Sequence, residues 1–251
     1  PLVVVKCGGA ASKSSPEKQI LPLHTAGNKV CVVHGAGPQI SQEMKQRGIE
    51  VRFIEGRRYT SEETLEVVRK LFMEVNAQLL IQLGAKSIGM MGDQVGLRAS
   101  RVEWLGLVGE PIPSAPRAIV TALEKGYIPV VAPLAEGPLN VNADDAAAAL
   151  AVGLNADELL FFTDVPGVLV ANHLAPLLEV KAIEKSLDAG EFNGGIVPKL
   201  KAASYAAKHG LQVKIGKTQI TGAGLEQLKG WATSRSSLSA VTRSPTSDWC
   251  S

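Results

Sequence analysis

The chain has 251 residues, of which 45% are apolar and 20% are charged, and its formal net charge is +2. This composition is typical of a folded globular protein of one or two domains and excludes a disordered chain. The 26 basic and 24 acidic residues are interspersed, with no block of lysine or arginine, so the charge pattern gives no support to a nucleic-acid binder.

Cysteine usage and hydropathy bear on the cellular location. The three cysteines, Cys7, Cys31 and Cys250, are widely spaced, which argues against both a disulfide framework and a zinc site. No apolar run approaches the roughly 18 residues of a membrane-spanning helix, and no charged and apolar leader precedes the first strand. We therefore expect a cytoplasmic protein without membrane contacts.

The chain opens on a run at 2–7 that is apolar apart from Lys6, which predicts a buried parallel strand. Gly8 and Gly9 follow, so this strand delivers a cation and a flexible turn at its carboxyl end, where open α/β sheets bind ligands. Taken alone, the stretch also fits an ordinary strand end. Residues 10–28 contain Pro22, and we expect a short, irregular crossover there.

A second buried strand is predicted at 29–34, and it ends in His34. The small residues that follow, Gly35, Ala36 and Gly37, lead into a polar helix that ends near Arg47. A strand, a small-residue loop and a helix start in this order aim backbone N–H groups at an anion.

A hairpin is predicted at 51–59, with its turn at Gly56 and with Arg57 and Arg58 on its second strand. Thr60 and Glu63 have the spacing of a capping box, with the threonine as the N-cap. Apolar residues then recur at helical spacing, which predicts a long amphipathic helix over 61–83. Its apolar stripe fits the core, and a helix of this length could also supply a dimer face.

The remaining elements alternate between strands and helices. The predicted strands are at 87–91, 128–131, 158–163 and 211–215, and the strand at 211–215 is expected to be the last of the chain. A polar hairpin is predicted at 97–112. Helices are predicted at 117–125, from just after Asp145 to about residue 152, at 181–189, at 193–209 and at 222–230. Residues 232–251 are predicted to be a weakly ordered tail. This alternation predicts an α/β fold with a mainly parallel sheet between helices.

Polar and glycine-rich motifs follow several of the predicted strands. No Walker loop, GxSxG, HExxH or GxGxxG pattern is present. Lysines and glycine-rich turns without a serine–histidine pair favour phosphoryl chemistry over hydrolysis. The motifs are VVVKCGGAA at 3–11, VVHGAGPQI at 32–40, GRRYTSEETLEVV at 56–68, LNVNADDAAAALA at 139–151, TDVPGVL at 163–169 and GGIVPKLKAA at 194–203.

These six motifs, in this order, resemble the amino acid kinase family, and in particular its acetylglutamate kinase branch. The resemblance covers roughly residues 2 to 209. It implies a three-layer αβα sandwich with two lobes: 1–155 for the acyl amino acid and for dimerisation, and 156–231 for ATP. It also implies ATP-dependent phosphorylation of the γ-carboxylate of N-acetyl-L-glutamate, the second step of arginine biosynthesis. We expect the protein to form a homodimer.

The resemblance also implies roles for individual residues. Lys6 and Lys199 would clamp the transferred phosphoryl group, and Asp144 would hold both lysines. The acyl amino acid would contact N–H groups of Gly35 and Ala36, the Arg58 side chain at its α-carboxylate, and Asn140. The nucleotide would contact Gly8, Gly9, Thr163, Asp164, Val165, Gly167, Gly195 and Ile196. Mg²⁺ would be carried by ATP, with no metal site on the protein.

Elementary chemistry is consistent with these roles. A carboxylate with a pKa of about 4.3 is ionised at neutral pH, so no general base is needed to activate it. The difficulty is the repulsion between this anion and the triphosphate, which cations on both sides of the transfer path reduce. The planar fork of Arg58 can bind both oxygens of a carboxylate.

Other interpretations of these residues remain open. Asp144 or Asp145 could cap the alanine-rich helix, Asp164 could satisfy backbone donors, and Arg57 fits a surface charge on the hairpin. Two rival functions are a carrier-protein-linked aminoadipate or glutamate kinase of the same family and a catalytically silent sensor of amino acids or nucleotides. The balanced charge gives no support to the first, and the presence of both lysines argues against the second.

The chain departs from the family pattern at two places. Ala36 stands where the pattern has a glycine, and its methyl group would restrict positive φ and could narrow the site. The carboxyl end, IGKTQITGAG at 215–224 and a serine-rich tail, replaces the family's closing segments, so part of the adenine side or an edge strand is in question. Because no helix precedes Leu2 in this sequence, the resemblance implies no feedback by arginine.

Overall fold

The central element of the computed structural model, which describes residues 1–8 and 15–222, is the amino-terminal strand β1. β1 (Leu2–Cys7) lies between β2 (Lys29–His34) and β11 (Glu158–Phe162) and is parallel to both. The sheet has eight strands in the order β14 (Leu177–Glu179), β16 (Thr218–Thr221), β15 (Gln212–Ile215), β11, β1, β2, β8 (Ile128–Ala132) and β5 (Ser87–Met91). The strand neighbours are parallel except for β15 and β16, so the predicted mainly parallel sheet is confirmed.

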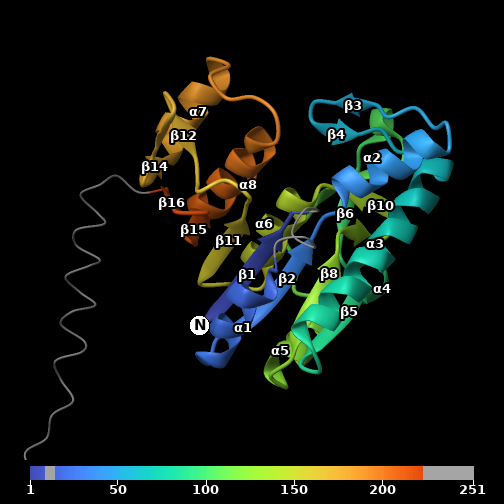
Figure 1. Cartoon of the computed structure of the whole chain (residues 1–251), viewed down its shortest axis with the longest axis horizontal. Helices are drawn as coiled ribbons and strands as arrows, with labels where there is room; N and C mark the ends of the chain where they lie inside the picture. Colours follow the sequence, from blue (N-terminus) through green and yellow to red (C-terminus); the bar gives the residue numbers. More distant parts are fainter. Residues whose placement is uncertain (9–14, 223–251) are drawn as a thin grey trace, which may run out of the picture.

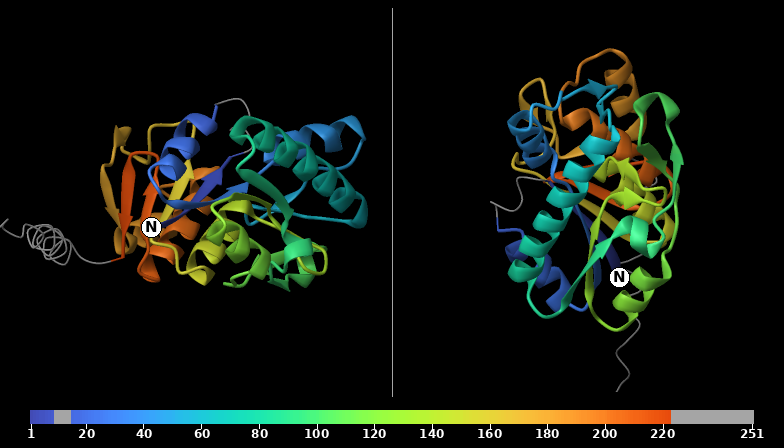
Figure 2. Two further views of the ribbon diagram at one scale, coloured as in Figure 1. Left: turned by 90° about the horizontal axis from the view of Figure 1, so that it is seen from below. Right: turned by 90° about the vertical axis from the view of Figure 1, so that its right-hand side faces the viewer.

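Helices cover both faces of this sheet, as Figures 1 and 2 show. One face packs against α1 (Glu17–Thr25), α2 (Gly37–Gln46) and α3 (Glu62–Leu83). The other face packs against α5 (Arg117–Glu124), α6 (Ala143–Gly153), α7 (Val180–Asp188) and α8 (Ile196–Lys208). The predicted three-layer αβα sandwich is therefore confirmed.

The two cores follow from the alternation of side chains along each strand. In β1, Val4 packs into the cluster under α5, α6 and α8, whereas Val3 and Val5 pack into the cluster under α1 and α3. All three valines are at most 2% exposed. A strand that is buried on both faces needs apolar residues at every position, which explains the unbroken run in the sequence.

Smaller elements surround the carboxyl ends of the main strands (Figure 1). A four-stranded sheet has the order β6 (Ala99–Arg101), β7 (Val108–Pro111), β10 (Leu139–Val141) and β9 (Leu134–Ala135). Two hairpins are formed by β3 (Phe53–Ile54) with β4 (Arg57–Arg58) and by β12 (Leu169–Val170) with β13 (His173–Leu174). The short elements are α4 (Gly92–Val95) and a 3₁₀ turn at Glu103–Leu105. The predicted hairpins at 51–59 and 97–112 are confirmed.

Three local predictions are wrong. The crossover at 10–28 is not irregular throughout, because α1 occupies nine of its residues and contains Pro22. The N-cap of α3 is Ser61, whose hydroxyl accepts from the N–H of Thr64 at 3.1 Å, and not Thr60. The strand at 212–215 is not the last, because β16 follows it, pairs with it and lies between β15 and the edge strand β14.

Two further expectations concern the boundary between the lobes and the residues that the structure does not describe. The lobe boundary expected between residues 155 and 156 falls between α6 and β11, and segments from both sides of it share the main sheet. Gly9, the predicted helix up to residue 230 and the tail at 232–251 lie outside the described residues.

Candidate active site

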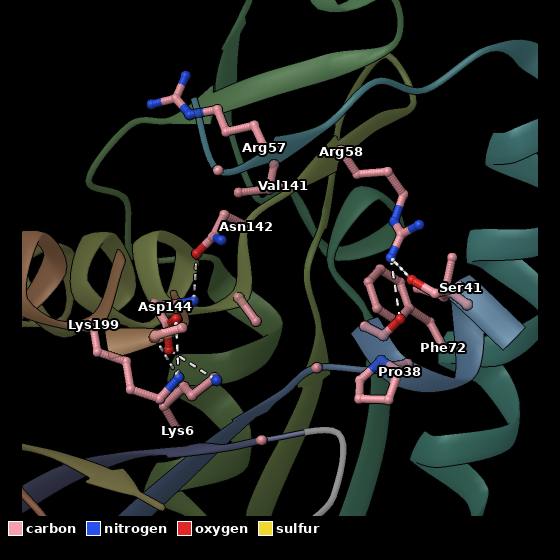
Figure 3. A pocket seen from close by; sticks show the side chains of 18 of the residues that line it. Lys6, Pro38, Ser41, Arg57, Arg58, Phe72, Val141, Asn142, Asp144 and Lys199 are labelled. Carbon is pink, nitrogen blue, oxygen red and sulfur yellow. Dashed lines mark hydrogen bonds and ion pairs between the residues drawn. The ribbon is translucent and has the colours of Figure 1, made fainter. Parts of the chain in front are cut away.

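Two lysines and one aspartate from distant parts of the chain meet at the carboxyl end of β1. The Nζ atom of Lys6 lies 2.8 Å from Oδ1 of Asp144, and the Nζ atom of Lys199 lies 3.5 Å from Oδ2. Lys6 is the penultimate residue of β1, Asp144 lies in the first turn of α6 and Lys199 lies in the first turn of α8 (Figure 3). Because the side chains of Lys6 and Asp144 are only 6% exposed, water screens their interaction weakly.

Asn142 positions Asp144. Its Oδ1 atom accepts hydrogen bonds from the N–H groups of Asp144 at 2.9 Å and Asp145 at 3.2 Å, so Asn142 is the N-cap of α6. The interpretation that Asp144 or Asp145 caps this helix is therefore wrong. Buried alanines at 146–149 let the helix pack closely on α8 and on β1, which brings the Asp144 carboxylate to the lysines.

The two lysines differ in their environment. Burial, followed by the positive charge of Lys6, holds the pKa of Lys199 below its ordinary value, and the carboxylate of Asp144 opposes this shift. Asp145, which follows Asp144, has its pKa raised to about 6, mainly by burial. The two lysines and Asp144, without Asp145, carry one more positive charge than negative charge when all three groups are ionised.

The loop after β2 brings backbone groups to the same region. The N–H of Gly35 donates to the carbonyl of Cys7 at 3.1 Å and so continues the pairing of β1 with β2. Ala36 is the N-cap of α2 and has φ −146° and ψ 26°. This conformation needs no positive φ, and the methyl group is buried, 1% exposed, in the core under α3. The expected restriction by the alanine methyl group is therefore wrong for this backbone.

Arg58 provides a second cationic centre across the cavity from the lysines (Figure 3). Its Nη2 atom donates to the carbonyl of Gly37 at 3.1 Å and to Oγ of Ser41 at 2.9 Å. Burial lowers its pKa to about 10, so the guanidinium remains charged at neutral pH. Arg58 is 7% exposed and forms no ion pair with an acidic residue among residues 1–8 and 15–222. A buried guanidinium of this kind favours an anionic ligand.

A cavity of about 820 Å³ connects the lysine cluster with Arg58. The predicted site residues that line it are Lys6, Gly8, Gly35, Ala36, Arg58, Asn140, Asp144, Thr163, Asp164, Gly195 and Lys199. The cavity lies at the carboxyl ends of β1, β2 and β11, which is the edge of the sheet where open α/β folds bind ligands.

Comparison with known proteins identifies the family to which this fold and these motifs belong. The model of the amino acid kinase family matches residues 1–217. The chain belongs to this family. It is 42% identical over 221 residues to the acetylglutamate kinase of Rubrobacter xylanophilus, covering 85% of this chain and 87% of that one. It is also 36% identical over 233 residues to the acetylglutamate kinase of Geobacillus kaustophilus, covering 86% and 90%.

Solved structures agree with this assignment. The crystal structure of smu.665 from Streptococcus mutans has a TM-score of 0.82 and 28% sequence identity to this chain, covering 88% of this chain and 99% of that one. The amino acid kinase fold predicted from the motifs is therefore confirmed.

Not every predicted site residue of this family member lies at the cavity. Val165 is 48% exposed, and its N–H donates to Oγ1 of Thr163 at 3.4 Å. Gly167 packs against β16, where an added Cβ atom would lie 2.6 Å from Oγ1 of Thr218. Ile196 packs against the core under α7 and α8. None of these three lines the cavity, and Gly9 lies outside the described residues.

Other residues line the cavity without having been singled out. Ser41 lies one turn into α2, and its Oγ atom accepts a hydrogen bond from Nη2 of Arg58. The only signal in the sequence was its place near the start of the helix that follows the Gly35–Gly37 loop. Arg57, interpreted as a surface charge, lines the cavity and lies 3.7 Å from Glu110. Phe72, a buried residue of α3, also lines the cavity.

Among the described residues, no group of three or more His, Cys, Asp or Glu side chains could hold a metal ion. Within the same residues, no helix is long and apolar enough to cross a membrane.

Proposed function

We propose that this amino acid kinase transfers the γ-phosphoryl group of ATP to the γ-carboxylate of N-acetyl-L-glutamate, the second step of arginine biosynthesis. Relatives named acetylglutamate kinase, at 42% and 36% identity over most of the chain, support this substrate. The observation that carries the proposal is the pair of lysines on Asp144 at one side of a cavity whose other side holds Arg58, a buried arginine without an acidic partner among the described residues.

The transfer requires electrostatic stabilisation more than proton transfer. An oxygen of the γ-carboxylate forms a bond to the γ-phosphorus while the bond from that phosphorus to the β,γ-bridging oxygen breaks, and ADP leaves. The acceptor is already ionised, so no proton moves. Lys6 and Lys199 reduce the repulsion between acceptor and phosphates, and Asp144 fixes the positions of both Nζ atoms.

The acceptor lies, in this proposal, between the lysines and Arg58. Its α-carboxylate takes the place of the missing acidic partner of Arg58, and Asn140, whose side chain already donates to Oγ1 of Thr60 at 3.1 Å, contacts the acetylated amino group. Of the two predicted loop residues, Gly35 already donates its N–H to the carbonyl of Cys7. The N–H of Ala36, a residue that lines the cavity, is therefore the proposed amide donor to the acceptor.

ATP binds, in this proposal, on the side of the cavity formed by β11 and α8. Gly8, Thr163, Asp164 and Gly195 line that side of the cavity. Val165, Gly167, Ile196 and Gly9 remain proposed contacts with parts of the nucleotide that extend beyond it. Bound Mg²⁺ neutralises phosphate charge, and we propose that it arrives with ATP because the donor set at the site is dominated by lysines.

The division of labour between two lobes also remains a proposal. Residues 1–155 contribute Arg58 and Asn140 for the acyl amino acid, and 156–231 contribute Lys199 and Gly195 for ATP. The cytoplasmic location expected from the sequence also stays a prediction.

A direct assay tests the proposed function. Purified full-length protein, ATP, Mg²⁺ and N-acetyl-L-glutamate are incubated with hydroxylamine, which converts the acyl phosphate into a coloured hydroxamate. We expect hydroxamate formation that depends on both substrates and is far weaker with free glutamate. Turnover of free glutamate alone, or only of a carrier-linked substrate, would contradict the proposal.

We further propose a homodimer that forms through α3 and the edge strand β5. Met73 and Ile81 of α3 are 56% and 83% exposed, and β5 is the outermost strand of the main sheet. Sedimentation of the full chain is expected to give twice the mass of one chain, and the double change of Met73 and Ile81 to glutamate is expected to give the monomer. A monomeric native protein at micromolar concentration would refute the dimer.

A further inference from the structure

A buried histidine and asparagine lie directly behind the cavity, although neither lines it. His34 ends β2 immediately before the Gly35–Ala36 loop and is 0% exposed. Asn76 lies in the middle of α3 and is 4% exposed. The Nδ2 atom of Asn76 lies 3.0 Å from Nε2 of His34 and donates to the carbonyl of Val130 at 2.9 Å. Two strands and one helix therefore meet at this pair.

The direction of these hydrogen bonds fixes the state of the histidine ring. The Val130 carbonyl can only accept, so the atom of Asn76 that faces it is the amide nitrogen, which carries two hydrogens. The second hydrogen points at Nε2 of His34, so Nε2 is the acceptor and the ring proton lies on Nδ1. Burial also lowers the pKa of His34 to about 4, which keeps the ring neutral at neutral pH.

The fixed ring contacts a wall of the cavity. His34 packs edge-on against Phe72, with ring centroids 5.9 Å apart and an interplanar angle of 82°. Phe72 lines the cavity close to Pro38 and Ser41 (Figure 3). The backbone of His34 also leads directly into the Ala36 amide at the start of α2. A change in the orientation of the His34 ring would therefore shift both Phe72, which forms an apolar wall of the cavity, and the loop that leads to Ala36.

A glycine on the edge strand gives Asn76 its place. A Cβ atom added to Gly89 would lie 2.2 Å from Oδ1 of Asn76 and 2.9 Å from Cδ1 of Leu80. Gly89 belongs to β5, so the amide of Asn76 lies against the backbone of that strand. The arrangement thus needs a residue without a side chain at a position that does not line the cavity.

We propose that Asn76 and His34 form a positioning pair, which holds the Ala36 amide and the Phe72 ring in place against the bound acceptor. This proposal rests on the proposed kinase function. Asn76 holds the ring in one tautomer and one orientation, and the ring holds the loop and Phe72. Neither side chain touches the substrate in this proposal, and both act through the residues that do.

Two variants and one control test this pair. Asn76→Leu removes the donor at similar size, and Gly89→Ala displaces the amide from behind. Both are expected to lower kcat/KM for N-acetylglutamate about 10- to 100-fold, while the KM for ATP stays within about twofold. Leu79→Ala, three residues further along α3 and 1% exposed, removes core packing and leaves the polar groups of both Asn76 and His34 in place. It is expected to lower Tm and leave both KM values unchanged.

The tautomer of His34 supplies a readout that does not depend on any variant. The protein has four histidines, so the ¹⁵N resonances of His34 can be assigned in labelled wild-type protein. We expect a protonated Nδ1 and an unprotonated Nε2 at neutral pH. The opposite tautomer, unchanged kcat/KM in both variants that fold, or an equal loss in Leu79→Ala would each overturn the pair. Absence of wild-type turnover would instead refute the proposed function, since the tautomer does not depend on it.

Discussion

Replacing Lys199 by alanine is expected to lower kcat about 10²- to 10³-fold, because one of the two cations that reduce charge repulsion at the transfer step is lost. The Nζ atom of Lys199 lies 3.5 Å from Asp144 and faces Lys6 across that carboxylate. The KM for N-acetylglutamate should change little, since Arg58 lies on the far side of the cavity. Initial rates from the hydroxamate assay measure the effect.

The matched control for this variant is Lys201→Ala. Lys201 lies on the same helix and is exposed, so it should keep kcat within about twofold of wild type. Full turnover by Lys199→Ala, or an equal loss in the control, would contradict the role of Lys199 in transfer.

The same cluster predicts the direction of a pH effect. Lys199 assists transfer only when protonated, and its pKa lies below the ordinary lysine value, so kcat should fall as pH rises through that lowered pKa. Asp144 raises the pKa of Lys199, and Asp144→Asn should therefore move the alkaline limb of the kcat profile to lower pH. A limb that stays in place or moves upward would show that another group controls it.

Replacing Arg58 by alanine is expected to raise the KM for N-acetylglutamate about 100-fold, with the KM for ATP changed less than about threefold. The buried guanidinium has backbone and hydroxyl partners in Gly37 and Ser41 and no acidic one among the described residues, so the acceptor carboxylate is its proposed counter-ion. Steady-state kinetics with each substrate varied in turn measure the split.

Two further variants sharpen the Arg58 result. Arg58→Lys keeps the charge and loses the planar fork, so it should recover only part of the affinity for the acceptor. Arg52→Ala removes an exposed arginine that stacks on Tyr59 near the same hairpin and should leave both KM values unchanged. An equal rise in the KM for both substrates in Arg58→Ala would point to collapse of the hairpin instead of loss of a carboxylate contact.

Much of the fold follows from local sequence patterns. The unbroken apolar runs at β1, β2 and β8 are buried on both faces, and a parallel sheet with helices on each side is the arrangement that achieves this. The predicted long helix over 61–83 is α3 at Glu62–Leu83, because its apolar positions recur at helical spacing. Capping was harder to predict, since Thr60 and Ser61 both have a side-chain oxygen. In the structure the Thr60 hydroxyl donates to the carbonyl of Arg58, and the Ser61 hydroxyl accepts from the N–H of Thr64.

The candidate site was predictable in its residue types and not in its contacts. The motifs identified Lys6, Asp144 and Lys199, but their meeting depends on where α6 and α8 pack on the sheet. The register of β1 beside β2 decides that the Gly35 N–H pairs with Cys7, so a residue chosen as an amide donor is already engaged.

The sequence by itself determined the fold class, the family and the two lysines of the site, because each depends on a local pattern or an ordered set of motifs. Only the tertiary structure decided the remaining features: the burial of Arg58 with no acidic partner in the described part of the chain, the asparagine that caps α6, and the pairing of Asn76 with His34. These depend on residues that are distant in the chain and are brought together by packing, whose geometry no local pattern contains.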